Sequence, residues 1–511
     1  MEFSTVDYIV IIIYLLGVAG VGIWIAGRQT STSDYFLGSR DIPWWAVLFS
    51  VVATETSTLT FISIPAVAYG GNLTFLQITL GYIVGRILVS IFFLPKYYEG
   101  NLSTAYQFLA NRFGASMRNA ASSTFMVTRL LADGVRLFAT AIPLAVILRL
   151  GGAFAGWSDI EVYLLSIAVI SIITLLYTLI GGIKAVVWMD VIQMAVYIGG
   201  AIVAGGIMLS GISGGFSGAM NMAADANKLQ VFDFGFDMAF AAFIAQPYTF
   251  FTALIGGAVF SVASHGTDQL IVQRLLTTRN LKDSQKALVW SGVVVAIQFG
   301  LFLVIGLLLY AFYNMQSADM LGLATTDEIF AKFIVEELPV GLSGLIVASL
   351  FAAAMSSLSS SLNSLASSTT LDIYKPYFGA NNTKAQDLKV SRIITIIWAA
   401  ILTCSAFFFA YLQLQEGERP AVVELGLGIA SYTYGGLLGA FLLGRLFQKP
   451  DTKDALFGFF LGLLALLFMV EGPVQNILPG DGLAIAWPLY TVVGSVIVVL
   501  AGNISSWIRK Q

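Results

Sequence analysis

The chain has 511 residues, of which 58% are hydrophobic and only 11% are charged. Because soluble proteins carry about 25% charged residues, a set of soluble domains is excluded. The net charge of −3 excludes a basic nucleic-acid-binding surface, and the single cysteine and single histidine argue against disulfide frameworks and zinc sites. The composition predicts an integral membrane protein.

Apolar blocks of about 20 or more residues, the length that a helix needs to cross a bilayer, follow one another along the chain. The first block is preceded by Glu2 rather than by basic residues, which is not the pattern of a cleavable signal peptide. We therefore predict an all-α fold with about thirteen transmembrane helices. They are expected near residues 6–26, 43–70, 74–98, 117–148, 161–181, 185–211, 237–264, 287–314, 340–371, 390–414, 420–446, 455–470 and 484–506.

The basic residues of the loops predict the orientation of the chain. Most of the 26 lysines and arginines fall in alternate loops, and loops rich in basic residues stay in the cytoplasm. This cytoplasmic set includes Arg274, Lys389 and Arg392. We expect a multi-pass protein of the inner (plasma) membrane, with its N-terminus outside and its C-terminus in the cytoplasm.

Polar residues inside the expected helices are functional candidates, because each is costly in hydrocarbon. The largest cluster shares one face of the helix expected at 340–371 and consists of Ser356, Ser359, Ser360 and Asn363. Hydroxyl oxygens stacked on one face are suited to a hard cation such as Na⁺. The alternative is close helix packing, with each serine bonded to the carbonyl one turn earlier.

Two segments predict breaks in transmembrane helices. Residues 53–60 (ATETSTLT) are polar at six of eight positions, and their hydroxyls compete with the helix for backbone hydrogen bonds. Gln246-Pro247 predicts a second break, five spans later. This spacing is typical of a five-helix inverted repeat with a binding site between the breaks. Glu55, the carboxylate of the first break, is a candidate to bind cation, substrate or proton.

Other charged residues inside the expected helices have both functional and structural interpretations. Asp190 is a functional candidate, or it pairs with a cytoplasmic lysine as a structural residue. Arg129, Asp133 and Arg136 are spaced for an internal salt bridge, unless Arg136 is free to bind a substrate carboxylate.

Two more such residues lie near helix ends. Arg86 is long enough to extend to the cytoplasmic face. His265 is expected to be structural, with a proton relay as the alternative.

Four motifs resemble the sodium–solute symporter family, which includes carriers of sugars, proline, sialic acid, iodide, monocarboxylates and vitamins. The motifs are residues 34–38 (DYFLG), 181–187 (GGIKAVV) with Asp190, 266–269 (GTDQ) with Gln273 and Arg274, and 353–358 (AAMSSL) with 362–364 (LNS). The resemblance covers about residues 5–450 and implies a LeuT-like inverted repeat. The expected parts are an extra helix and loop (1–42), two five-helix repeats (43–212 and 237–446) and two C-terminal helices (450–511).

The resemblance also implies two sodium sites. The first would use the backbone carbonyls of Ala53, Thr56 and Ala353 and the hydroxyls of Ser356 and Ser357. The second, found in the sialic acid branch of the family, would use Asp190, Ser356, Ser359 and Ser360.

The solute site is likewise implied by the resemblance, in which Arg136 would bind the carboxylate of the solute. Its residues would be Glu55, Ser57, Thr58, Thr60, Gln77 and Arg136. Ser261 and Ser264 stand where the sugar carriers have an asparagine and a gating tyrosine, which counts against a glucose-type pocket.

We therefore expect a secondary active transporter and not an enzyme. It would move Na⁺ and a small polar organic solute (a sugar, sialic acid, amino acid or carboxylate) into the cell by alternating access. Its partners would be Na⁺, the solute and the lipid bilayer, with no nucleic acid and no obligate protein partner. The alternative mechanism is proton-coupled symport through Glu55. A channel would need a continuous polar file, whereas the polar residues here cluster at one depth.

Overall fold

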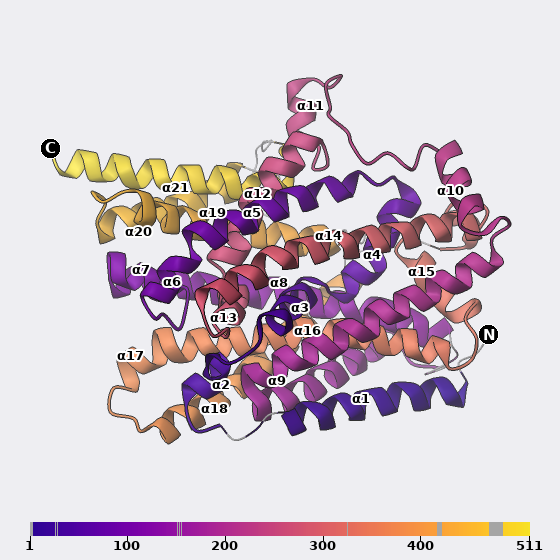
Figure 1. The fold of residues 1–511 in the computed structure, drawn as a ribbon, viewed down its shortest axis with the longest axis horizontal. Coiled ribbons are helices and arrows are strands. Elements are labelled where there is room, and N and C mark those ends of the chain that lie inside the picture. The colour runs from indigo at the N-terminus through magenta and orange to yellow at the C-terminus, as the bar shows by residue number, and fades with distance from the viewer. Residues whose placement is uncertain are drawn as a thin grey trace.

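The computed structural model describes residues 4–25, 27, 29–150, 152, 154, 156–323, 325–415, 422–469 and 484–511. These residues form an all-helical protein, and no β-strand occurs among them. The long helices lie roughly alongside one another in one bundle, with α1 at one side and α20 and α21 at the opposite side (Figure 1).

The long helices are α1 (Thr5–Ile25), α3 (Trp44–Glu55), α4 (Thr58–Gly70), α5 (Gln77–Phe92), α8 (Ala115–Leu150), α9 (Asp159–Gly211), α12 (Phe250–Gly266), α14 (Leu281–Phe312), α16 (Leu342–Ser368), α18 (Lys384–Gln415), α19 (Val422–Leu446), α20 (Thr452–Met469) and α21 (Trp487–Arg509). The shorter α-helices are α2 (Thr32–Leu37), α6 (Leu94–Glu99), α7 (Tyr106–Phe113), α10 (Gly215–Asp225), α11 (Phe240–Ala245), α13 (Gln269–Leu275), α15 (Glu328–Glu336) and α17 (Lys375–Phe378). Single turns of other helix types are η1 (Gly38–Arg40), η2 (Thr74–Leu76), η3 (Asp319–Leu321) and η4 (Thr369–Tyr374).

Within the described residues, nine helices are long and apolar enough to cross a membrane, or up to eleven if each of two bent helix pairs forms one span. The predicted number of thirteen is therefore not confirmed. The expected helices at 420–446 and 455–470 extend in part over residues outside the described ranges.

The helix α9 covers two of the expected spans, at 161–181 and 185–211. It has 53 residues and bends at Gly182, where φ is 56°. A Cβ atom at Gly182 would lie 2.5 Å from the carbonyl oxygen of Tyr35, so the bend requires glycine for both conformation and space. The loop expected between these spans is reduced to this bend.

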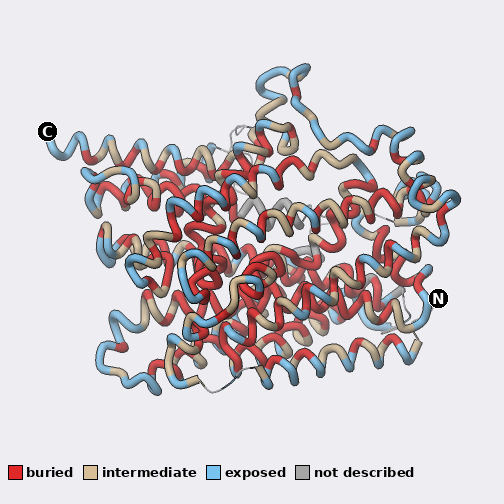
Figure 2. Tube along the Cα trace, viewed as in Figure 1, coloured by how far each residue is buried: buried red, intermediate tan, exposed pale blue. Residues whose placement is uncertain are grey.

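Buried residues concentrate in the middle of the bundle (Figure 2). The helix α16 is buried along nearly its whole length and packs against α1, α8, α9 and α18. Its alanines and serines allow this close approach, because small side chains let helix backbones come together. The serine face is thus placed at the centre of the molecule.

Two bent helix pairs interrupt the bundle. The helices α3 and α4 meet at 62°, which confirms the predicted break in segment 53–60. Residues 246–249 between α11 and α12 are not helical, so a helix does end at Gln246-Pro247. However, α11 has only six residues, and within the described residues α11 and α12 are not one of the bent pairs that could form a single span, so a broken transmembrane helix at this position is not confirmed.

The second bent pair, α12 and α13 at 65°, was not predicted. Asp268 caps α13 by accepting a hydrogen bond from the N–H of Leu270 at 2.8 Å. An aspartate directly before a run of helix-forming residues is the sequence signal for such a start.

Candidate functional site

The break after α3 frees a backbone carbonyl in the middle of the protein. In a continuous helix, the N–H of Ser57 would bond to the carbonyl of Ala53. Instead, this N–H donates to Oγ1 of Thr60 at 3.3 Å, within the capping box that starts α4. The carbonyl of Ala53 therefore loses its helical donor, as expected for a cation ligand at a broken helix.

The helix α16 brings hydroxyl groups to this break. Oγ of Ser357 lies 3.4 Å from the carbonyl oxygen of Thr56. The hydroxyl of Thr56 accepts from the side chain of Gln298 at 2.5 Å, which holds the residue in place. Ala353 precedes Ser357 by one helical turn and is fully buried. The structure thus places the expected ligands of the first sodium site on two elements that meet at the break.

A second cluster surrounds Asp190 on α9. Its Oδ1 accepts from Oγ of Ser356 at 2.6 Å, and its Oδ2 accepts from Oγ of Ser50 at 2.5 Å. The guanidinium of Arg274 also contacts Oδ2, at 3.3 Å. All four side chains are fully buried, so the charges of Asp190 and Arg274 compensate each other inside the protein.

The remaining residues expected for the second sodium site lie beside this pair. Ser360 accepts a hydrogen bond from Arg274, and its own hydroxyl donates to the carbonyl of Ser356 at 2.7 Å. The hydroxyl of Ser359 donates to the same carbonyl at 3.0 Å. Asp190, Ser356 and Ser360 are therefore brought together, whereas Ser359 bonds to the backbone of its own helix.

The assignment of Arg274 to a cytoplasmic loop was wrong. This residue lies on α13, which turns into the bundle at the bend after α12 and buries the guanidinium against Asp190. The partner of Asp190 is therefore this arginine and not a cytoplasmic lysine. In the sequence, the GTDQ motif with an arginine five residues after it was the available signal for the buried position of Arg274.

Glu55 forms a third charged cluster. Nη2 of Arg86 donates to both carboxylate oxygens of Glu55, at 2.6 and 2.5 Å, and Nε2 of His265 contacts Oε1. Arg86 is fully buried and also donates to Oγ of Ser291 at 2.8 Å. The expectation that Arg86 extends to the cytoplasmic face was wrong, because the carboxylate of Glu55 compensates its charge inside the bundle. The contact between His265 and Glu55 was not expected either.

Arg136 is held less firmly than the other buried cations. Its Nη1 lies 3.9 Å from Oδ1 of Asp133, and its side chain is 24% exposed. Arg129 contacts Asp268 and donates to the hydroxyl of Tyr434 at 2.5 Å, so the expected internal salt bridge engages Arg129 more than Arg136.

Arg136 and Ser357 line the same small cavity, together with Asp133 and Ser361. The cavity measures about 10 Å³, which is room for about one water molecule. Arg136 and Ser357, a residue expected at the first sodium site, therefore line one cavity.

The other expected solute ligands are tied to neighbouring elements. Thr58 donates to the carbonyl of Leu350 on α16 at 3.0 Å, while Ser57 and Thr60 bond to each other in the capping box. Gln77 donates to the carbonyl of Tyr248 at 2.8 Å and accepts from the N–H of Asp233 at 3.2 Å. Gln77 thus joins the start of α5 to the break before α12.

A bundle of apolar helices, broken in the middle beside a cluster of carbonyl and hydroxyl oxygens, defines a cation-coupled membrane carrier. Oxygen ligands of this kind fit a hard cation. The sequence model of the sodium:solute symporter family matches residues 35–462, and the chain belongs to this family.

Similar proteins agree with this assignment. The sodium/sialic acid symporter NanT of Aliivibrio fischeri is 30% identical, over 100% of this chain and 94% of its own length. A solved Na⁺-coupled sialic acid symporter, in a substrate-bound outward-open state with a novel Na⁺ site, has a TM-score of 0.82 at 29% identity and covers 99% of this chain and 98% of its own. MhsT in complex with L-phenylalanine has a TM-score of 0.51 at 16% identity over 90% of this chain and 98% of its own, a likeness of fold alone.

The protein is therefore a sodium-coupled solute symporter of the membrane and not an enzyme, and Na⁺ is its coupling ion. The relatives are sodium symporters, so the comparisons give no support to proton coupling through Glu55.

Proposed function

We propose that the solute is a small organic anion with a carboxylate group, such as an acidic sugar of the sialic acid class, and that two Na⁺ ions accompany it. The position of Arg136 carries this proposal. A guanidinium binds a carboxylate through two parallel hydrogen bonds. Arg136 has only a distant carboxylate neighbour and lies beside the first sodium site.

The neighbours of Asp133 favour this role for Arg136. Oδ2 of Asp133 accepts from Oγ of Ser361 at 2.6 Å, and Oδ1 lies closer to Arg129, at 3.5 Å, than to Arg136. An incoming carboxylate would therefore compete with a weak contact. Because the cavity is small, solute binding requires the surrounding helices to move apart, as alternating access demands.

Two sodium ions are proposed at the two clusters on α16. The first site comprises Ala53, Thr56, Ala353, Ser356 and Ser357, and the second comprises Asp190, Ser356, Ser359 and Ser360. Na⁺ at the second site would take the place that the guanidinium of Arg274 now occupies beside Ser360.

The number of ions decides how strongly an anion is concentrated. With one Na⁺ per monovalent anion the transport is electroneutral, and a tenfold sodium gradient gives about tenfold accumulation. With two Na⁺, one net charge also crosses the membrane and adds about 2.3 kcal/mol at 100 mV. The total of about 5 kcal/mol then supports roughly 10³- to 10⁴-fold accumulation.

The proposed arrangement has thirteen transmembrane helices, with an N-terminal part (1–42), inverted repeats at 43–212 and 237–446, and two final helices (450–511). The bends between α3 and α4 and between α12 and α13 support it, because each falls in the first helix of a proposed repeat. The basic residues in alternate loops support an N-terminus outside the cell and a C-terminus in the cytoplasm.

Uptake into proteoliposomes tests the solute class. We expect saturable, Na⁺-dependent uptake of a carboxylate-bearing solute, and a KM raised about 10- to 100-fold by Arg136→Gln, since a charged hydrogen-bonded pair is lost. The control is Arg149→Gln, because Arg149 pairs with Asp159 at the surface, away from the site. Uptake of a neutral sugar with unchanged KM in Arg136→Gln would overturn the proposal.

A further inference from the structure

A hollow of about 540 Å³ lies between the segment that follows α1, the middle of α9 and the first turns of α18. Its lining includes Gln29, Leu179, Lys389, Arg392, Ile393 and Ile396. The volume is that of a pocket for a small ligand. The hollow is separate from the sodium and solute sites, since none of its lining residues belongs to them.

Two cations of α18 line the hollow without a carboxylate partner. Lys389 and Arg392 are three residues apart, so they lie on the same face of the helix. Within the described part of the chain, no carboxylate lies within 4.0 Å of either cation. Like charges at this spacing repel each other, and an anion between them would relieve the repulsion.

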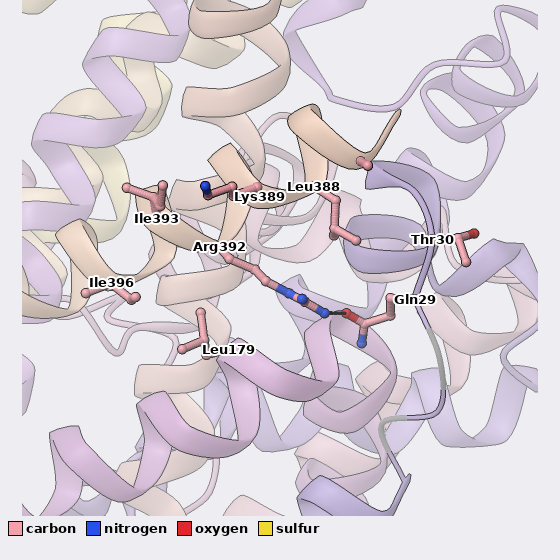
Figure 3. Close-up of a pocket in the computed structure, with 9 residues that line it drawn as sticks. Gln29, Thr30, Leu179, Leu388, Lys389, Arg392, Ile393 and Ile396 are labelled. Carbon is pink, nitrogen blue, oxygen red and sulfur yellow. Dashed lines mark hydrogen bonds between the residues drawn. The ribbon is translucent and has the colours of Figure 1, made fainter. Parts of the chain in front are cut away.

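The guanidinium of Arg392 points across the hollow toward Gln29, whose Oε1 accepts a hydrogen bond at 3.3 Å (Figure 3). Its Nε atom is buried and has no hydrogen-bond partner in the structure. A buried guanidinium nitrogen without an acceptor is unfavourable, so the guanidinium of Arg392 is incompletely paired beside the hollow.

The nearby carboxylates are engaged elsewhere. Asp34 accepts from the N–H and the hydroxyl of Thr30, at 3.0 and 2.9 Å, and from the hydroxyl of Ser39 at 2.8 Å. Asp387, on α18 itself, pairs with Lys375 at 3.1 Å. The hydrogen bonds of Asp34 come from neutral groups, so its charge remains beside the lining residue Thr30, and the two cations Lys389 and Arg392 outnumber it. The net charge of the hollow is therefore positive.

One wall of the hollow is apolar and continues onto the outer surface of the bundle. Ile393 and Ile396 follow Arg392 along the same face of α18 and are 46% and 45% exposed. Ile180, next to Leu179 on α9, is 40% exposed. Such side chains on the outside of a membrane protein contact lipid chains. A free phosphate ion would not contact this apolar wall. A phospholipid would contact both parts, with its headgroup at the cations and its acyl chains along the isoleucines.

We propose that this hollow binds an anionic phospholipid, with the phosphate at Lys389 and Arg392 and an acyl chain along Ile393 and Ile396. In the proposed orientation the site lies at the cytoplasmic leaflet, where basic pockets between helices bind anionic headgroups. The bound lipid would join α18 to the segment after α1 through Arg392 and Gln29.

Lipid titration of the full-length protein tests this proposal. The protein in phosphatidylcholine nanodiscs is compared with nanodiscs that contain increasing fractions of phosphatidylglycerol, and the thermal midpoint is measured. We expect a saturable rise of the midpoint with phosphatidylglycerol. The apparent affinity should fall about fivefold in Lys389→Gln and about 25-fold in the variant with both Lys389→Gln and Arg392→Gln, since each of these cations would lose a direct charged contact with the bound phosphate.

The matched control is Lys282→Gln with Lys286→Gln, which removes two exposed cations from the first turns of α14 without touching the hollow. We expect its affinity for phosphatidylglycerol to equal that of the wild type. Equal affinities in the hollow variants and the control would overturn the proposal. A rise of the midpoint with inorganic phosphate alone, in phosphatidylcholine, would overturn the lipid as the source of the anion. If the double variant fails to fold, Lys389→Gln decides, since its side chain is exposed and an unchanged affinity refutes the site.

Discussion

The clusters around Glu55 and Asp190 each pair a carboxylate with an arginine inside the bundle. They differ in the partners that the two carboxylate oxygens contact. Both oxygens of Glu55 accept from Arg86, and His265 adds a contact. Asp190 receives a guanidinium on one oxygen only, at 3.3 Å, and its other oxygen accepts a serine hydroxyl.

This difference indicates which carboxylate is available to an ion. A hydroxyl can rotate to offer its lone pairs to Na⁺ while the carboxylate supplies the charge, as at Asp190 and Ser356. At Glu55, an incoming Na⁺ would first have to displace Nη2 of Arg86, which contacts both carboxylate oxygens. We therefore propose that Asp190 binds the cation and that Glu55 has a structural role, holding the end of α3 beside the proposed first sodium site.

The largest expected effect comes from Asp190→Asn. The variant leaves the guanidinium of Arg274 buried without a compensating charge, which costs about 3–5 kcal/mol of stability. We expect the thermal midpoint to fall and the sodium dependence of uptake to change from two ions to one. Adding Arg274→Gln should restore stability but not the second ion. Two-ion coupling in the double variant would show that Asp190 has only a structural role.

A smaller loss is expected from Glu55→Gln, which removes the countercharge of Arg86. Because Glu55 is 21% exposed, water compensates part of the loss, and we expect about 2–3 kcal/mol. The number of coupled Na⁺ ions, measured from the reversal potential of uptake in proteoliposomes, should stay the same as in the wild type. A change in this number would contradict the assignment of Glu55.

Ser359→Ala is expected to act on the second sodium site alone. If Ser359 turns its hydroxyl to the proposed ion, the variant loses one ligand, and the sodium concentration for half-maximal uptake should rise about three- to tenfold with little change in the thermal midpoint. The matched control is Ser349→Ala on the same helix, whose hydroxyl bonds to the carbonyls of Val196 and Leu345 away from the site. If both variants shift the sodium dependence equally, the effect comes from packing of α16.

The smallest effect concerns Asp34, a loop carboxylate held by hydrogen bonds without a cation. Burial raises its pKa, but the backbone N–H of Thr30 and the hydroxyls around it outweigh this and lower the pKa to about 2. Its stabilisation is therefore complete above the unfolded pKa of about 4 and is lost as the pH falls toward about 2. The thermal midpoint of Asp34→Asn should lie slightly below that of the wild type at pH 6, and the difference should shrink below pH 4. A constant difference across this range would mean that the charge of Asp34 does not contribute.

The sequence predicted the parts of the site that depend on local pattern. Clustered hydroxyl residues in segment 53–60 and the proline at 247 disfavour a continuous helix, and serine spacing on α16 defines one face. The break in segment 53–60 and the buried serine face were confirmed, whereas the second bent pair lies after α12 and not at residue 247. The position of Arg274 was missed, because the sequence does not distinguish an arginine in a loop from one that a bend buries. The bend between α12 and α13 is seen only in the structure.

By itself, the sequence determined that this protein lies in a membrane and resembles the sodium–solute symporters, because apolar length and local motifs are properties of short segments. Only the tertiary structure decided which charge pairs with which. Asp190 and Arg274 are 84 residues apart, and Glu55 and Arg86 are 31 apart on different helices. A buried charge must find its partner within a few ångströms, and that partner is set by how helices pack rather than by what lies next to it in the chain.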